Sequence, residues 1–209
     1  MAEVKKPYPL SLQIDYPEKL NRLTTFFRAF TIIPILIIMG LVAGSVSKTN
    51  WMSDWGFQLS SAALVIAPLV LMLLFRKKYP RWWFDWNLAL LRFGTRIEAY
   101  FYLLRDEYPS TDEEQAVQLD ITYPDAQKEL MRGMPLVKWL LAIPHYIVLG
   151  LLGIAVAVCL VVTWFAILFT GRFPRGLFEF VVGYMRWWLR VCAYACVLVT
   201  DCYPPFSLD

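Results

Sequence analysis

The chain contains two similar halves, and this internal repeat is the feature that most constrains its fold. Ile14-Asp15-Tyr16-Pro17 aligns with Ile121-Thr122-Tyr123-Pro124, and the alignment continues until each half ends on Tyr-Pro, at 108–109 and 203–204. Repeated halves of a membrane protein usually pack about a pseudo-twofold axis. We therefore expect residues 1–109 and 117–209 to form two related repeats, joined by an acidic linker at 110–116.

Composition indicates an integral membrane protein. Hydrophobic residues make up 58% of the 209 residues, and nine of them are Trp and fourteen Phe, which exceeds the apolar share of soluble domains. The net charge of +3 suits a membrane surface rather than nucleic acid. Residues 1–19 carry several charges and no apolar stretch. We therefore expect the first membrane segment to act as its own insertion signal, without cleavage.

Both halves contain hydrophobic stretches with the length of membrane segments. Residues 26–46 and 57–75 can each cross a bilayer, since about 20 helical residues span its hydrocarbon core. Residues 136–169 form one almost unbroken apolar stretch, which is too long for a single upright span. We expect a tight hairpin there, with its turn near 150–153 and arms that either just cross or re-enter. Prolines should bend these segments or mark their first turns: Pro34, Pro68 and Pro144.

The distribution of positive charge predicts the orientation in the membrane. With a hairpin in each half, all of the 20 Lys and Arg residues except Lys48 lie on one side. Such a bias marks the cytoplasmic side of a membrane protein. We therefore expect cytoplasmic N and C termini.

Two matching segments, residues 81–104 and 175–199, are predicted to be amphipathic helices. Pro80 and Pro174 stand just ahead of the first turn, where proline is tolerated. Charged residues spaced by four, seven and four positions share one narrow stripe of each helix. We call these stripes the arginine seams: Arg81, Asp85, Arg92 and Arg96 in the first half, and Arg175, Glu179, Arg186 and Arg190 in the second. Beyond the helices, the alignment sets Tyr100 against Tyr194 and Glu107 against Asp201.

The arginine seams predict four structural and four candidate binding residues. The four-apart pairs Arg81–Asp85 and Arg175–Glu179 are expected to be ion pairs. Apart from Glu98, no carboxylate stands near the other four, and guanidinium binds phosphate in bidentate fashion. The candidate anion- or lipid-binding residues are therefore Arg92, Arg96, Arg186 and Arg190. Either both helices lie in the membrane plane with arginines at the phosphates, or the seams face each other across the axis as a polar chamber.

A short alternating stretch precedes each hydrophobic segment, at residues 11–16 and 118–123. Alternation of polar and apolar residues is typical of a half-buried strand. Because neither strand protects its own edges, we expect the two to pair in a small cytoplasmic sheet that ties the halves together. The fold class is therefore an all-α integral membrane protein of two tandem repeats. Each repeat would be a hydrophobic hairpin and an in-plane amphipathic helix, preceded by one short strand.

Catalytic and metal-binding patterns do not stand out. His145 is the single histidine, and a lone histidine at a membrane segment more often satisfies a backbone group than binds metal. Cys192 and Cys196 are one helical turn apart, which suits small apolar filler better than a redox or metal pair. We assign no catalytic residues, no metal ligands and no cofactor.

Several motifs of the second half occur together in a known pattern: Ile143-Pro144-His145-Tyr146, residues 168–178, Tyr184-Met185-Arg186-Trp187 and residues 200–206. They closely resemble the bacterial membrane family called domain of unknown function 4389. The first half is a looser version, in which Arg76-Lys77-Lys78 replaces Thr170-Gly171-Arg172 and Trp82-Trp83 replaces Gly176-Leu177. The resemblance implies a bacterial inner-membrane protein and carries no activity or cofactor.

Three classes of function are consistent with these observations. The leading hypothesis is a non-catalytic membrane subunit or scaffold that docks a partner complex through its aromatic and arginine-bearing helices. The alternative is an anionic-lipid or small-anion binding or transport protein that uses the arginine seams, and a membrane enzyme is the third. Expected partners are anionic phospholipids and a membrane complex or a second copy, and not nucleic acid.

Overall fold

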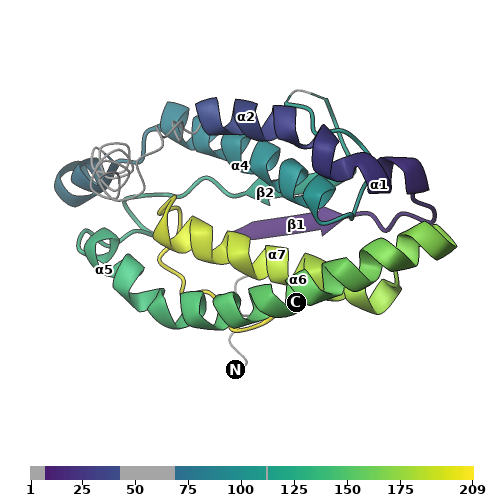
Figure 1. Cartoon of the computed structure of the whole chain (residues 1–209). Coiled ribbons are helices and arrows are strands. Elements are labelled where there is room, and N and C mark those ends of the chain that lie inside the picture. The colour runs from purple at the N-terminus through teal and green to yellow at the C-terminus, as the bar shows by residue number, and fades with distance from the viewer. Residues whose placement is uncertain (1–7, 43–68, 112) are drawn as a thin grey trace, which may run out of the picture.

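The computed structural model describes residues 8–42, 69–111 and 113–209, which are mostly helical with one small sheet (Figure 1). The first half contributes β1 (Leu10–Ile14), α1 (Arg22–Thr31), α2 (Ile33–Val42), a short π-helical stretch η1 (Met72–Arg76) and α4 (Arg81–Phe101). The second half contributes β2 (Val117–Ile121), α5 (Met134–Leu141), α6 (Ile143–Thr170) and α7 (Arg175–Ala195). Pro68, and most of the predicted membrane segment 57–75, lie outside the described residues.

The two halves form two helical layers with the sheet between them. In Figure 1, α1, α2 and α4 lie above the strands, and α5, α6 and α7 lie below them. β1 and β2 pair antiparallel, with Leu12 opposite Leu119 at the centre, as the alternating pattern predicted. One face of the sheet is buried: Leu10, Leu12, Val117, Leu119 and Ile121. The other face is polar and exposed: Ser11, Gln13, Gln118 and Asp120.

The phase of the hydrogen-bond ladder decides which backbone groups point out of the sheet. The N–H of Thr122 donates to the carbonyl of Pro9 at 2.9 Å. Because paired residues alternate between bonded and non-bonded positions in an antiparallel ladder, Leu12 and Leu119 form a non-bonded pair. Their N–H and C=O groups therefore point away from each other, toward the two outer edges of the sheet.

Both predicted amphipathic helices are formed, and both start where the sequence indicated. α4 begins directly after Pro80 and α7 directly after Pro174. Each ends a few residues earlier than predicted, because the chain turns through a left-handed residue: Leu103 with φ 64° and Leu198 with φ 60°. A positive φ is unfavourable for a residue with a Cβ. The same uncommon turn nevertheless occurs at matching positions of the two halves.

The core joins the two halves through aromatic residues. The ring of Phe84, on α4, meets Tyr123 edge-on with 5.1 Å between centroids, and Phe178, on α7, meets Tyr16 in the same way at 5.0 Å. Tyr16 and Tyr123 each follow the strand of their own half. Each helix thus packs on the aromatic residue that follows the other half's strand.

The predicted hairpin in residues 136–169 is not formed. α6 is one continuous helix of 28 residues, about 42 Å long at 1.5 Å per residue, and the expected turn at 150–153 lies inside it. The chain bends at Ala142 instead, just before Pro144, which occupies the first turn of α6. Gly153 serves close packing rather than a turn, because a Cβ there would lie 3.3 Å from the hydroxyl oxygen of Tyr184. The excess length is thus accommodated by a bend at one end.

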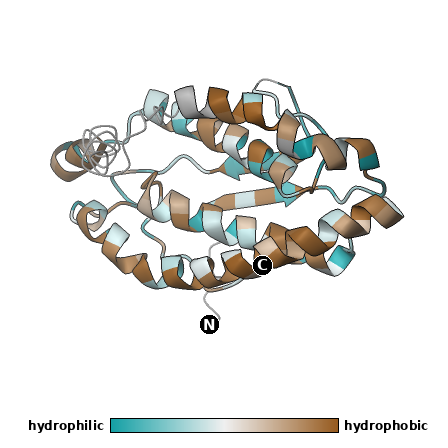
Figure 2. Ribbon diagram, in the orientation of Figure 1, coloured by the Kyte–Doolittle hydropathy of each residue, from teal (hydrophilic) through white to brown (hydrophobic). Residues whose placement is uncertain are grey.

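One face of α6 is apolar and exposed along its whole length, and much of α6 is brown in Figure 2. The exposed residues recur at helical spacing: Ile147, Leu151, Ile154, Val158, Val161, Phe165 and Phe169. Within the described residues, one helical stretch, Met134–Thr170, is long and apolar enough to cross a membrane. Residues 26–42 of the first predicted membrane segment form the end of α1 and all of α2, with the break at Ile32, two residues before Pro34.

Candidate functional site

Arg92 and Arg186 cap the two open edges of the sheet. Arg92 Nε donates to the carbonyl of Leu119 at 2.8 Å, and Arg186 Nη2 donates to the carbonyl of Leu12 at 3.4 Å. These are the outward-pointing carbonyls of the central pair. Arg92 also forms an ion pair with Asp120 at 2.7 Å. An open strand edge invites pairing with other chains, so each arginine protects the strand of the opposite half.

The other two candidate anion-binding arginines also donate to backbone carbonyls. Arg96 Nη1 bonds the carbonyl of Ser110 at 2.6 Å, and Arg190 Nη1 bonds that of Ser207 at 3.4 Å. Both carbonyls come shortly after the Tyr-Pro pair of their half. The guanidinium of Arg190 also lies over the ring of Tyr8, 5.9 Å from its centroid. These arginines hold the segments that leave each half.

The four-apart ion pairs expected in the seams are not formed in the described part of the chain: Arg81 with Asp85, and Arg175 with Glu179. Arg81 lies over the ring of Tyr123 at 5.7 Å, and Arg175 lies over the ring of Tyr16 at 5.2 Å. An exposed ion pair contributes only about 0–1 kcal/mol. A tyrosine face that is fixed in place competes well with it, and the contact again joins opposite halves.

Two tyrosine hydroxyls also form hydrogen bonds between the two halves. Tyr16 donates to the carbonyl of Phe173, and Tyr123 donates to the carbonyl of Tyr79. Phe173 and Tyr79 are matching residues of the aromatic-Pro-Arg triplets that precede α7 and α4. The start of each helix is therefore fixed by the loop of the other half.

A buried cation lies in each half, and the sequence reasoning missed both. In the second half, Lys138 is fully buried, and its Nζ lies 2.7 Å from the Asp201 carboxylate and donates to the Thr200 carbonyl at 2.7 Å. It also lies 5.2 Å from the centroid of the Tyr194 ring. A buried charge needs a partner and further hydrogen bonds, and Lys138 has both.

Arg28 occupies the matching place in the first half. Its guanidinium pairs with Asp106, donates to the carbonyl of Tyr100 at 2.9 Å and lies 4.5 Å from the centroid of that ring. The residue of the first half that corresponds to Asp201 is thus Asp106 and not Glu107. The expected alignment was therefore shifted by one residue at this point. Alignment on the Tyr-Pro pairs would have matched these residues correctly, because Asp106 and Asp201 each stand two residues before the tyrosine.

His145 is buried in an aromatic cluster rather than bonded to the backbone. Its Nδ1 accepts a hydrogen bond from Trp187 Nε1 at 3.1 Å, and the ring of Phe206 stacks on it at 4.0 Å. Ile35 stands at the matching position of the first half and is also buried. Cys192, on α7, and Cys196, directly after the helix, are both free thiols.

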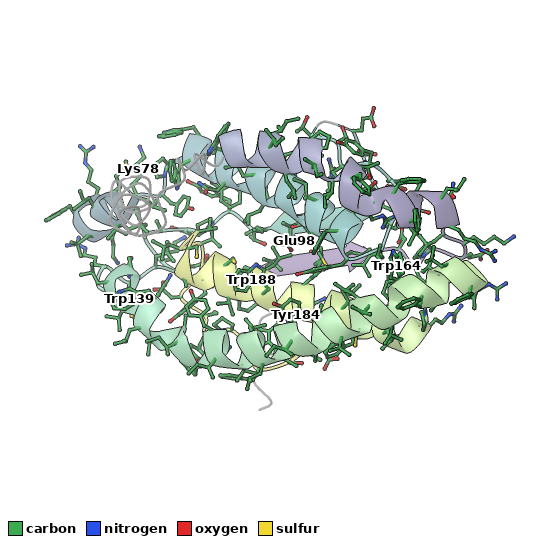
Figure 3. The ribbon with its side chains drawn as sticks, in the orientation of Figure 1. Lys78, Glu98, Trp139, Trp164, Tyr184 and Trp188 are labelled. Carbon is green, nitrogen blue, oxygen red and sulfur yellow. The ribbon has the colours of Figure 1, made fainter. Side chains whose placement is uncertain are left out.

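Glu98 projects from α4 into the space toward α7, where Tyr184 and Trp188 stand (Figure 3). No basic partner stands there among the residues that the structure describes, and burial raises the pKa of its carboxyl to about 7. The phenol of Tyr102 also lies near this carboxyl. Glu98 can therefore carry or release a proton near neutral pH.

Two surface pockets are lined by charged residues. A pocket of about 340 Å³ lies beside β2 and includes Arg92, Arg96, Glu114 and Asp120. Because two acidic residues face the two arginines, this pocket is electrically balanced. A second pocket, of about 430 Å³, lies at the turn that precedes α4.

One comparison with known proteins gave a match, and it lies in the second half. Residues 134–207 match the family model described as Domain of unknown function (DUF4389). Neither the search of curated proteins nor that of solved structures gave a match. The matched part runs from α5 through α7 to the segment beyond it, and includes Lys138, Arg186, Arg190 and Asp201.

Proposed function

From the match of residues 134–207 to the DUF4389 model and from the exposed surface of α4, we propose that the protein is a non-catalytic membrane scaffold of the bacterial inner membrane. Its two halves are related by a pseudo-twofold axis, and it docks a partner protein on the outer face of α4. The alternative of an anion site at the seams is less favoured, because all four arginines already donate to carbonyls within the chain.

The observation that carries the proposal is the exposed stripe of α4. Trp82 is 70% exposed and Trp86 52% exposed, and Asp85 and Arg92 lie on the same face. Tryptophan and arginine are the residues most enriched in binding hot spots. The exposed face of α6, in contrast, carries apolar residues without charges. The mixed stripe of α4 therefore suits a protein partner better than acyl chains.

The matching stripe of α7 indicates what kind of segment binds. Its later part, at Gly183 and Arg186, is covered by the chain's own residues: Arg186 Nη1 donates to the carbonyl of Leu208 at 3.3 Å, and Gly183 makes room for Leu208. An added Cβ on Gly183 would lie 2.7 Å from the Leu208 carbonyl oxygen. An extended segment with free carbonyls is therefore a suitable partner for α4.

The contacts of α7 also support a placement in the membrane. β2 precedes α5, whereas α7 follows α6 and reaches β1 through Arg186. The polar face of the sheet, with Gln118 and Asp120, belongs in water. Both ends of the α5–α6 segment thus lie on the side of the sheet, and α6 lies in the membrane plane like an interfacial helix. This placement is consistent with a cytoplasmic sheet and cytoplasmic N and C termini.

Isolation of the full chain in native membrane discs, without detergent, tests the scaffold function. Mass spectrometry of the discs should find a stoichiometric protein partner, or a second copy, with the wild type. The double variant Trp82→Ala/Trp86→Ala should lose it and keep its helical content. Phe180→Ala is the matched control on α7 and should retain the partner.

A monomer without a protein partner would contradict the scaffold function. If such a monomer retained an anionic lipid that was lost in the Arg92→Glu/Arg186→Glu variant, the seams themselves would be the binding site.

A further inference from the structure

The turn before α4 contains a strained residue, whereas the matching turn before α7 has glycine at that position. Lys77 has φ 47°, in the left-handed region, and the matching residue before α7 is Gly171 with φ 70°. Glycine adopts this conformation without strain, whereas lysine does not. Strained backbone of this kind gathers at functional sites, which directs attention to the Lys77 side chain.

This side chain lies at a cationic pocket. The pocket has a volume of about 430 Å³ and lies between the turn, with Lys77, Lys78 and Tyr79, and residues 123–127. Lys77 Nζ donates to the carbonyl of Gln127 at 3.4 Å, and Lys78 is exposed (Figure 3). The one carboxylate in the lining, that of Asp125, forms an ion pair with Lys128 at 3.4 Å. The lining therefore has a surplus of positive charge.

The matching turn at the other end of the molecule is closed. The N–H of Leu20 donates to the carbonyl of Gly171 at 2.9 Å, and Arg22 Nη2 donates to the carbonyl of Phe169 at 3.1 Å. The cation there is used to cap the end of α6. At the Lys77 turn, the loop that follows Tyr123 is longer than the one that follows Tyr16, and the pocket remains between loop and turn.

Two exposed apolar residues precede the lysines of the pocket in the chain. Leu71 and Phe75 stand one helical turn apart just before Lys77 and are both exposed, Phe75 by 71%. We propose that the Lys77–Lys78 pocket binds the phosphate of an anionic phospholipid, with its acyl chains along Leu71 and Phe75. Ammonium groups bind phosphate as point charges, and basic residues at the cytoplasmic surface attract anionic lipids. This site is independent of partner docking on α4.

Lipid retention in discs of stated composition tests the site. The purified full chain is placed in discs of phosphatidylcholine with a minor share of phosphatidylglycerol, and bound lipid is counted by native mass spectrometry. The wild type should enrich phosphatidylglycerol, and Lys77→Gly/Lys78→Gln should bind it roughly tenfold more weakly. Because glycine is the residue that the matching turn uses, this variant should unfold at the same or a higher temperature. Arg172→Gln, at the matching turn, should retain the lipid.

Two results would overturn the proposal. One is equal enrichment of phosphatidylglycerol by the wild type and the double lysine variant. The other is binding of inorganic phosphate to the wild type in pure phosphatidylcholine discs without any enrichment of phosphatidylglycerol, which would identify a site for free phosphate.

Discussion

Leu12 and Leu119 lie opposite each other at the centre of the two-stranded sheet, and they are matching residues of the two halves. The two contacts correspond: Arg186 bonds the carbonyl of Leu12 and Arg92 bonds the carbonyl of Leu119. The cross-half contacts of Tyr16 and Tyr123 correspond in the same way. A sheet of two strands is marginally stable by itself. The sheet therefore depends on these contacts between the two halves for its stability.

Loss of an edge cap should weaken the fold moderately. Arg92→Met removes the bond to the Leu119 carbonyl and the ion pair with Asp120, and keeps most of the side-chain volume. Because the side chain is 44% exposed, we expect a loss of only about 1 kcal/mol in the free energy of unfolding. Chemical unfolding followed by tryptophan fluorescence measures it. Arg172→Met is the control and should stay within about 0.5 kcal/mol of the wild type; equal losses in both variants would exclude the edge-capping role.

Loss of the buried cation of the second half should be far more damaging. Lys138→Met leaves the Asp201 carboxylate without its cation in a buried place, which costs about 3–5 kcal/mol. Lys128→Met is the matched control, because the ion pair of Lys128 with Asp125 is exposed, and it should change stability by less than about 0.5 kcal/mol. The same unfolding measurement compares the two.

A second substitution separates charge from packing at this site. Asp201→Asn in the Lys138→Met background removes the uncompensated charge and should restore part of the lost stability. A double variant that is no more stable than Lys138→Met would show that lost packing, and not the unpaired carboxylate, is responsible.

Local signals in the sequence predicted the elements that depend on local chemistry. Proline is tolerated at the start of a helix and not in its interior. Pro80 and Pro174 therefore placed the starts of α4 and α7 to the residue. The alternation around Leu12 and Leu119 likewise gave both strands and their pairing. Such features depend on φ angles and on side-chain spacing, which the sequence displays directly.

Features that depend on partners distant in the chain could not be predicted in this way. The apolar stretch 136–169 is equally compatible with a hairpin and with one helix, and the packing of Gly153 against Tyr184 favours the helix. The buried ion pair of Lys138 could not be inferred, because its partner Asp201 is far along the chain. The seam arginines looked unpartnered because most of their acceptors are backbone carbonyls, which no side-chain pattern reveals, and because Asp120, the carboxylate that pairs with Arg92, is distant in the chain.

The cover over α7 should depend on the absence of a side chain at Gly183. In Gly183→Ala, the new Cβ would lie 2.7 Å from the Leu208 carbonyl oxygen, so the segment after Phe206 should leave the helix. Faster hydrogen exchange at the backbone amides of residues 207–209 would report this. Gly176→Ala, on the same helix, has open space at its Cβ and should leave the exchange unchanged, with a small gain in stability from helix propensity.

The carboxyl of Glu98 should make stability depend on pH. Its pKa is about 7 in the folded chain against 4.5 for the free side chain, so between these values the native state binds more protons than the unfolded state. The contribution of this carboxyl to stability is therefore fully present below about pH 4.5 and is lost as the pH rises through 7, by up to roughly 3 kcal/mol. Thermal unfolding of Glu98→Gln should lose this dependence, and Glu179→Gln should keep it. An unchanged pH profile in Glu98→Gln would exclude this carboxyl as the source.

The two ends of the α5–α6 segment should be reached by reagents from the same side of the membrane. Each of Arg132 and Arg172 is replaced by Cys in a background without the four native cysteines, and a membrane-impermeant maleimide is applied to right-side-out and to inverted vesicles. Because β2 precedes α5 while α7 is bonded to β1, we expect both sites to react in inverted vesicles only. Leu151→Cys, on the apolar face of α6, should react in neither. Reaction of the two end positions from opposite sides would show that α6 crosses the membrane, and labelling of Leu151→Cys from outside would restore the hairpin.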